Sequence, residues 1–308
     1  MASNLAARLL AGRWTLNGIA TAIDAVLGPM DPTPRARLAT AILALAEDTY
    51  PPAPGLLTSA LIGVPAFQVP EGRTVPASLD PPRFAPAPRF VGVAVPPITT
   101  VGALAAWLDI SPDQLDWLAD LRGSHGQERS ARLRHYRYAL VPKADGSVRL
   151  LEAPKPRLKA IQRRILRDIL ALVPVHDRAM GFVPGRSCLR AAGIHAGEAI
   201  VATFDLSRFF ASIARPRVYG LFRALGYPWA VAWRLAGLCA TVTPRAVRDR
   251  LPDGEEIHSR PHLPQGAPTS PALANLLAWR LDLRLDRLAR SAGAAYTRYT
   301  DDLAFSGD

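Results

Sequence analysis

The 308-residue sequence has few cysteines and no long hydrophobic runs. Its apolar runs are too short to span a bilayer, and residues 1–13 lack the pattern of a secretory signal, so the sequence predicts no membrane partner. The two cysteines, Cys188 and Cys239, fit a reducing cytoplasm and exclude a disulfide framework. Neither cysteine has a partner at metal-ligand spacing, which argues against a zinc site. We therefore expect a cytoplasmic protein.

Lysine is also scarce, although the chain is strongly basic. The net charge is +11, and only three of the 37 basic residues are lysine. A basic balance favours a polyanionic partner, because basic side chains neutralise phosphates and release counterions. The arginine excess is typical of a GC-rich genome. All three lysines, Lys143, Lys155 and Lys159, fall in one short segment, which genome bias does not explain.

Proline divides the chain into three predicted regions. Residues 1–50 carry an apolar stripe typical of a helix, and Thr33-Pro34 predicts the start of a second helix. Twelve of the 29 prolines lie in residues 51–98, which indicates a linker with little regular structure. Residues 99–308 form the main globular part.

The main part opens with two predicted short helices over residues 99–121, and Ser111 to Gln114 has capping-box spacing. A small packing subdomain is the favoured interpretation of this pair. A helix-turn-helix that binds DNA is the alternative.

Two aspartates near the end of the chain are candidate metal ligands. Residues 295–305 predict a strand, a tight turn and a strand, with Tyr299-Thr300-Asp301-Asp302 at the turn. Two Mg²⁺ ions about 4 Å apart can stabilise both the attacking and the leaving oxygen in nucleotidyl transfer. Mg²⁺ takes oxygen ligands, and one turn can present two carboxylates. An ordinary Asp-rich hairpin turn accounts for this tetrapeptide equally well.

Asp205 is the candidate third carboxylate. The apolar run of residues 199–204 predicts a buried strand that ends at this aspartate. Two aromatic residues follow. Phe209 is expected in the core, whereas Phe210 is either a core residue or the floor under an incoming sugar.

A rigid loop over residues 263–271 is predicted to lead into a helix that begins at Ser270-Pro271. The leucines at positions 273, 277, 281 and 285 would line one face of that helix and several arginines another. A loop that enters a helix N-terminus suits contact with a primer, a base or a phosphate, and Gln265 is the polar side chain best placed for it. A proline-rich connector before an amphipathic helix is the alternative.

A hairpin is predicted over residues 138–150, with Asp145-Gly146 at its turn. Lys143 and Arg149 flank the turn and can point together at a triphosphate. The helix that follows has an inner apolar face and an outer basic face. Together with Lys155, this outer face is either a wall for nucleic acid or an ordinary solvated surface; its basic residues are Lys159, Arg163, Arg164 and Arg167.

These segments, in this order, resemble reverse transcriptases, most closely the bacterial retron type. The resemblance covers about Thr99 to Asp308 and includes the loop Gly181–Ser187. It implies an α/β (α+β) right-hand fold with fingers and a palm that has an antiparallel sheet and packed helices. It also implies that residues 1–50 are an extra helical region. The final palm strands and the thumb would lie beyond Asp308, so we expect the chain to be an incomplete part of the enzyme.

The resemblance implies RNA-directed DNA synthesis from dNTPs on a primer–template. Its expected partners are a structured non-coding RNA and, in phage defence, an effector protein. Two Mg²⁺ ions, which Mn²⁺ can replace, would bind Asp205, Asp301, Asp302 and the carbonyl of Leu206. Phe210 would act as the sugar gate and Gln265 would line the nucleotide pocket. Lys143 and Arg149 would hold the triphosphate.

One segment departs from the retron pattern. Retron enzymes carry Asn-Ala-x-x-His before the first catalytic aspartate, and here Ala191 replaces the asparagine while Ala192 and His195 fit. His195 is equally compatible with a structural role. A group II intron reverse transcriptase and a non-catalytic RNA-binding protein with a polymerase-like fold remain the alternatives.

Overall fold

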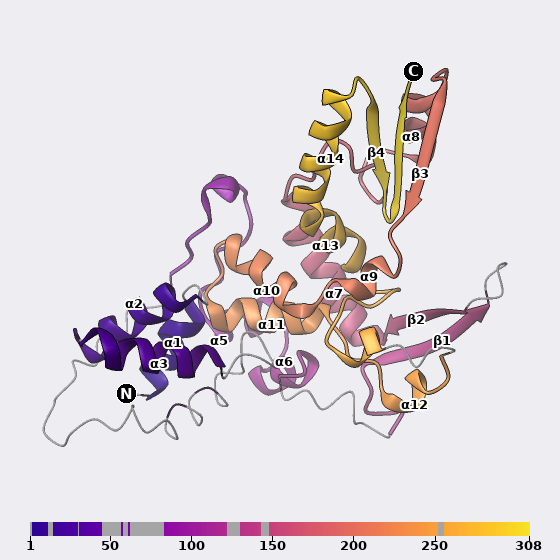
Figure 1. Ribbon diagram of the computed structural model, residues 1–308. Helices are drawn as coiled ribbons and strands as arrows, with labels where there is room; N and C mark the ends of the chain where they lie inside the picture. The colour runs from indigo at the N-terminus through magenta and orange to yellow at the C-terminus, as the bar shows by residue number, and fades with distance from the viewer. Residues whose placement is uncertain are drawn as a thin grey trace, which may run out of the picture. The chain divides into compact units, whose positions relative to one another are not determined.

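The computed structural model describes residues 2–11, 15–29, 31–44, 57, 61, 83–121, 130–142, 148–251 and 256–308 (Figure 1). It mixes helices with two antiparallel sheets, which confirms the predicted mixed α/β (α+β) class. The chain divides into two compact units, one formed by Met1–Phe84 with Pro228–Ala230 and the other by Ala85–Tyr227 with Val231–Asp308. None of the helices in the described residues is long and apolar enough to cross a membrane.

The first unit contains three helices, α1 (Ala2–Ala11), α2 (Leu16–Leu27) and α3 (Pro32–Ala44). The Thr15 side chain caps α2 by accepting a hydrogen bond from the Gly18 amide, and the apolar faces of the three helices share one core. The predicted start of the second helix at Thr33-Pro34 is wrong, because α3 begins at Pro32. A proline fits the first helical turn, where its missing N–H costs nothing.

The predicted linker, residues 51–98, lies mostly outside the described residues. Leu57 and Leu61 are described as helical, and both are buried in the core of the first unit. The two compact units divide at Phe84. The boundaries at residues 50 and 98 stay predictions.

The second unit begins with a short 3₁₀ turn, η2 (Pro88–Phe90), and the helix pair α5 (Val101–Leu108) and α6 (Pro112–Leu118). The Ser111–Gln114 capping box is confirmed, with both of its hydrogen bonds present. The helix pair packs against α11 (Trp229–Cys239): Arg234 donates to Asp116 at 2.6 Å, and a Cβ on Gly237 would lie 2.2 Å from the Ala119 carbonyl oxygen. These contacts favour the packing interpretation over the DNA-binding one.

A hairpin follows, made of β1 (Tyr136–Pro142) and β2 (Val148–Pro154), with Pro142 opposite Val148. The hairpin is therefore confirmed, while Lys143 and the Asp145-Gly146 turn lie outside the described residues. Helix α7 (Pro156–Asp168) leaves β2 and buries the predicted apolar face. Its outer side carries the basic residues.

The second sheet has the strand order β3 (Ile200–Asp205), β5 (Asp302–Gly307) and β4 (Ala295–Tyr299). Side chains alternate between the faces of a sheet, so paired residues share a face. Helix α8 (Cys188–His195) contacts Thr297 and Ser306 on one face, and α14 (Trp279–Ser291) contacts Tyr296 and Arg298 on the other (Figure 1).

The prediction that residues 199–204 form a buried strand is wrong. β3 is an edge strand, and the side chains of Ile200, Val201 and Phe204 are 64%, 51% and 58% exposed. An edge strand has a neighbour on one side only, and α14 packs against β4 at the opposite edge of the sheet. An apolar run therefore predicted the strand but not its burial.

The prediction of one continuous helix from Ser270 is also wrong. The structure has two helices, α13 (Ser270–Leu277) and α14, separated at Ala278, and Thr269 rather than Ser270 precedes the first. The buried side of α14 includes Asp282 and Asp286. The other described elements are η3 (Leu170–Leu172), α9 (Phe209–Ser212), α10 (Arg215–Ala224), α12 (Arg245–Arg248) and η4 (Glu256–Ser259).

Candidate active site

The three candidate carboxylates meet at one end of the three-stranded sheet. Asp205 at the end of β3 is paired with Asp302 at the start of β5, so their side chains share a face. The Leu206 amide donates a hydrogen bond of 3.0 Å to the Asp301 carbonyl, which fastens the segment after β3 to the turn. Residues nearly one hundred positions apart in the sequence thus form one acidic site.

The turn between β4 and β5 is a two-residue hairpin turn. Tyr299 pairs with Asp302, so only Thr300 and Asp301 connect the two strands. Thr300 has φ +62°, a left-handed conformation that a two-residue hairpin turn requires and that is disfavoured for a branched side chain. Gly181 lies against this turn, and a Cβ there would come within 2.8 Å of the Thr300 hydroxyl. Only glycine at position 181 leaves room for the turn.

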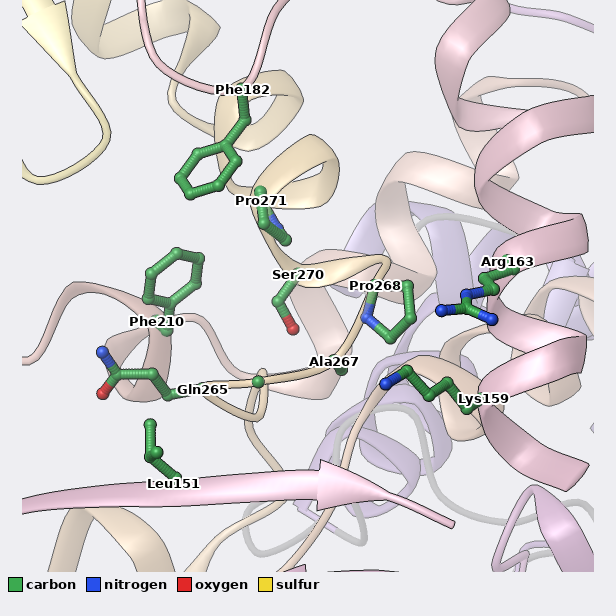
Figure 2. Close-up of a pocket in the computed structure, with 11 residues that line it drawn as sticks. Leu151, Lys159, Arg163, Phe182, Phe210, Gln265, Ala267, Pro268, Ser270 and Pro271 are labelled. Atoms are coloured by element: carbon green, nitrogen blue, oxygen red, sulfur yellow. The ribbon is translucent and has the colours of Figure 1, made fainter. Parts of the chain in front are cut away.

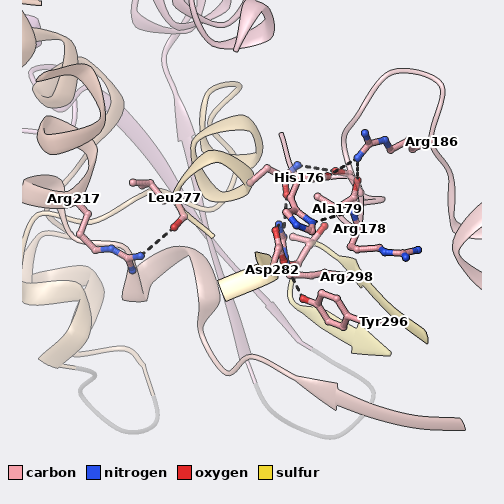
Figure 3. A network of polar contacts seen from close by, with 12 residues as sticks. His176, Arg178, Ala179, Arg186, Arg217, Leu277, Asp282, Tyr296 and Arg298 are labelled. Carbon is pink, nitrogen blue, oxygen red and sulfur yellow. Dashed lines mark hydrogen bonds and ion pairs between the residues drawn. The ribbon is translucent and has the colours of Figure 1, made fainter. Parts of the chain in front are cut away.

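A buried arginine, Arg298, supports the turn between β4 and β5 through hydrogen bonds. Arg298 is fully buried and all three of its guanidinium nitrogens donate hydrogen bonds (Figure 3). Its Nε and Nη2 bind the two oxygens of Asp282 at 2.7 and 2.8 Å, and its Nη1 donates to the Thr300 carbonyl at 2.8 Å. Tyr296 donates to the same carboxylate at 2.9 Å. A bidentate pair of this kind fixes both partners in position.

The segment before Gly181 extends this support. The Met180 amide donates to the Arg298 carbonyl at 2.7 Å, and the Arg298 amide donates to the Arg178 carbonyl at 2.8 Å. The Arg178 side chain in turn donates to Asp286 on α14 at 2.8 Å. Arg186 holds the same segment through the carbonyls of His176 and Ala179 (Figure 3). The turn is therefore fastened to α14 and to the loop that precedes α8.

The electrostatics of the turn favour a bound cation. Partial burial, together with the neighbouring charges of Asp302 and Asp205, raises the pKa of Asp301 above its ordinary value, although Arg149 opposes the shift. The ionised carboxylates repel one another in this position. A divalent ion would relieve that repulsion, and carboxylate oxygens are the ligands that Mg²⁺ prefers.

A pocket of about 440 Å³ contains several of the predicted binding residues (Figure 2). Phe210 and Gln265 lie toward one end of it, and Lys159 and Arg163 toward the other. Phe209 is buried, as predicted, while Phe210 lines the pocket and is not a core residue. Gln265 is held in place through its carbonyl, which accepts a 2.8 Å hydrogen bond from the Glu152 amide.

Three of the other basic residues predicted to bind nucleic acid have side chains that contact other groups of the protein. The Lys155 ammonium is engaged by the carbonyls of Ala131 and Arg132, both at 2.8 Å. The Arg164 guanidinium lies 5.1 Å from the Trp107 ring, and Arg167 pairs with its neighbour Asp168 at 2.5 Å. Lys155, Lys159 and Arg163 line a second pocket, of about 310 Å³, together with Arg137, which the sequence reasoning missed.

His195 has a structural role. Its ring nitrogens lie 2.7 Å from the hydroxyls of Ser306 and Thr297, so it joins α8 to the two strands that flank the turn. Burial lowers the pKa of this histidine, although Glu198 partly opposes the shift. The ring therefore acts as a neutral link between the two hydroxyls.

Sequence reasoning did not find Arg298 or Asp282, and it named Gly181 only as the first residue of the loop Gly181–Ser187, without a role. Asp282 and Asp286 are four residues apart among the leucines of α14, and this spacing could have predicted a buried acidic face. Arg298 comes one residue before the Tyr299–Asp302 turn, and its position inside a strand could have predicted a buried, paired arginine.

The comparisons with known proteins agree with this geometry. The family model described as reverse transcriptase (RNA-dependent DNA polymerase) matches residues 141–308, which is more than half of the chain. The chain therefore belongs to the reverse transcriptase family.

The similar curated proteins are retron enzymes, which confirms the predicted retron type. Over 182 residues the chain is 48% identical to the Retron Mx65 reverse transcriptase of Myxococcus xanthus, covering 58% of this chain and 42% of the relative. Over 208 residues it is 44% identical to the Retron Mx162 reverse transcriptase of the same organism, covering 66% and 41%. It is also 35% identical over 159 residues to the Retron Ec86 reverse transcriptase of Escherichia coli, covering 52% and 44%. The chain spans less than half the length of these relatives.

Proposed function

We propose that this chain carries the catalytic region of a retron-type RNA-directed DNA polymerase, which extends a primer on an RNA template with dNTPs. The pairing of Asp205 with Asp302, with Asp301 beside them, is the observation that carries this proposal. In it, the three-stranded sheet is the palm and the β1–β2 hairpin belongs to the fingers. The retron relatives make a structured non-coding RNA the proposed template, and an effector in phage defence stays a prediction of the resemblance.

Asp205, Asp301 and Asp302, with the carbonyl of Leu206, would hold two Mg²⁺ ions, and Mn²⁺ suits the same oxygen donors. Bound ions of this kind stabilise charge on the attacking 3′-oxygen and on the leaving oxygen. The hydrogen bond from the Leu206 amide to the Asp301 carbonyl keeps the backbone of Leu206 beside the turn, which supports this role for its carbonyl. The Arg298 network keeps the turn rigid, which supports a fixed ligand geometry.

The remaining site residues would bind the nucleotide. Arg149 lies close enough to Asp301 to oppose the rise of its pKa, which supports a role for Arg149 in holding a triphosphate near the carboxylates, with Lys143 as its predicted partner. In the pocket, Gln265 would contact the nucleotide and Phe210 would exclude a 2′-hydroxyl.

Phe210→Ala should raise ribonucleotide incorporation by about 10-fold or more. Unchanged sugar selection in single-nucleotide extension would rule out this gate.

Primer extension on an RNA template by the protein in its full length tests the proposed function. Asp301→Asn should reduce the extension rate by about 100-fold or more, because metal ligands matter at least as much as the outer residues that orient them. Asp249→Asn, which alters an exposed carboxylate next to α12, is the matched control and should keep the wild-type rate. Equal activity in Asp301→Asn and the wild type would contradict the proposal.

A measurement of stability separates lost chemistry from lost folding. Because the pKa of Asp301 is raised, the stability linked to its protonated form is present at low pH and is lost as the pH rises through that pKa. At neutral pH without metal, Asp301→Asn therefore removes a repulsive charge. We expect its melting temperature to equal or exceed that of the wild type in EDTA.

A further inference from the structure

A second cluster of metal-ligand side chains lies outside the carboxylate turn. It consists of Glu152 from β2, His258 from η4 and His262, and these side chains are 1%, 8% and 1% exposed. One donor atom of each lies within 4.8 Å of the other two. The proposed polymerase chemistry uses none of the three.

One contact in the cluster requires a cation between its two atoms. The His262 Nδ1 lies 2.7 Å from the Arg260 carbonyl, so the proton of a neutral ring sits on Nδ1. The Nε2 lone pair then faces the Glu152 Oε2 at 2.9 Å and the His258 Nδ1 at 3.3 Å. A lone pair and a carboxylate oxygen repel at this distance. A cation between them removes the repulsion, and that cation is either an extra proton or a metal ion.

The geometry suits a metal ion. A tetrahedral zinc ion with bonds of about 2.0–2.1 Å places its ligand atoms roughly 3.3 Å apart. The two distances from the His262 Nε2, 2.9 and 3.3 Å, need shifts of only a few tenths of an ångström, and the third distance, between the Glu152 and His258 donor atoms, is no longer than 4.8 Å.

The surrounding groups already orient the ligands. Thr243 donates to the other Glu152 oxygen at 2.7 Å, which leaves Oε2 for the cluster. The bond from the His262 Nδ1 to a backbone carbonyl is typical of a metal-bound histidine, because it fixes the tautomer and the ring orientation.

We propose that Glu152, His258 and His262 form a site for a divalent transition metal ion that stabilises the fold, with Zn²⁺ as the best fit and a water molecule as the fourth ligand. Two imidazole nitrogens and one carboxylate oxygen suit Zn²⁺, whereas Mg²⁺ takes oxygen ligands. The sequence analysis argued against a zinc site because the cysteines lack suitably spaced partners. The proposed ligands are histidine and glutamate, so that argument does not apply to them. His258 and His262 are four residues apart in the sequence, and that spacing was the signal available.

The site would fasten β2 to the segment between Thr241 and His262. That segment is already closed by two hydrogen bonds between the backbones of Thr241 and His262, at 3.0 and 2.9 Å. β2 also supports the nucleotide-pocket loop, because the Glu152 amide binds the Gln265 carbonyl, and a Cβ on Gly266 would lie 3.2 Å from the Glu152 carbonyl oxygen. A metal at Glu152 therefore stabilises the backbone that carries Gln265.

Metal content and thermal stability test this site without any polymerase assay. The full chain is prepared without a polyhistidine tag, in the Asp301→Asn background so that the carboxylate turn contributes little, and is stripped with EDTA. One equivalent of Zn²⁺ should be retained after dialysis. Free Zn²⁺ at about 100 times its Kd should raise the melting temperature by roughly 5 °C, and Mg²⁺ at the same concentration should not. Co²⁺ in place of Zn²⁺ should give the intense visible absorption of a tetrahedral site.

Variants locate the ion. His258→Ala and Glu152→Gln should lose the bound Zn²⁺ and the cobalt spectrum, while His176→Ala, a histidine packed against Trp279 elsewhere, should keep both. If the first two variants do not fold, the cobalt titration of the parent protein still decides. A folded parent that binds no Zn²⁺ and shows no tetrahedral cobalt spectrum overturns the proposal, and the cluster is then held by a proton on His262. Zinc retained by a folded His258→Ala overturns it as well.

Discussion

Helices α7 and α14 are both 13 residues long and both combine leucine or isoleucine with several arginines. In α7 the apolar side chains of Leu158, Ile161 and Ile165 are buried, and Arg163 and Arg167 are exposed. This is the ordinary arrangement of an amphipathic helix. Of its basic residues, Lys159 and Arg163 line the pockets and can contact phosphate groups.

In α14 the buried side includes the carboxylates of Asp282 and Asp286. They are paired with Arg298 and Arg178, which come from β4 and from the segment before Gly181. An ion pair can be buried only when its hydrogen bonds are well satisfied, and here every guanidinium nitrogen of Arg298 has an acceptor. The two helices show that the same mixture of leucine and charge can make an exposed basic face or a support for the turn that carries Asp301 and Asp302.

The largest effect that we expect comes from breaking the buried pair on α14. Asp282→Ala leaves Arg298 charged and without its carboxylate in a fully buried position, so the free energy of unfolding should fall by about 3–5 kcal/mol. Urea unfolding measures this. The control on the exposed side of the same helix, Arg287→Ala, should keep the wild-type midpoint, and an equally stable Asp282→Ala would show that the pair contributes little.

The second effect concerns the exposed face of α7. Replacing both Lys159 and Arg163 by alanine should weaken RNA binding and reduce the slope of log affinity against log salt by about 1.4, since each phosphate contact with a single strand contributes about 0.7. Folding should be unaffected. Filter binding at several salt concentrations measures both quantities.

The double substitution Arg284→Ala/Arg287→Ala removes the same charge from α14. If it lowers RNA affinity and salt slope as much as the α7 double variant does, the two exposed faces are equivalent and the comparison fails. We expect it to leave the salt slope nearly unchanged.

The smallest effect is a pH dependence at Asp286. Burial by itself would raise its pKa, but hydrogen bonds from Arg178 and Arg290 outweigh burial and lower the pKa below its ordinary value. A lowered pKa means that the stability from this carboxylate is present above its ordinary pKa and is lost as the pH falls through the folded-state pKa. Asp286→Asn should therefore be less stable than the wild type at pH 7, and the gap should narrow below about pH 4. A gap that stays constant with pH would exclude ionisation as the cause.

Much of the candidate site was predictable because its signals are local. A strand that ends in Asp205 and a tight turn that carries Asp301 and Asp302 follow from short segments of sequence. Phe210 and Gln265 both line a pocket, although the residues around Phe210 left a core position as an alternative and only the resemblance assigned the two to a nucleotide pocket. The burial of β3 was predicted wrongly, since position in a sheet depends on which strands pair and not on the composition of one strand.

By itself the sequence determined the α7 helix, the pair α5 and α6, the two hairpins, the basic charge and the identity of the candidate carboxylates, because these depend on residues close together in the chain. The tertiary structure decided which charges are buried and which are exposed. Arg298 and Asp282 support the turn, and Glu152 meets His262, because segments up to 110 residues apart come into contact. Such contacts depend on the packing of whole elements, which no local pattern of residues specifies.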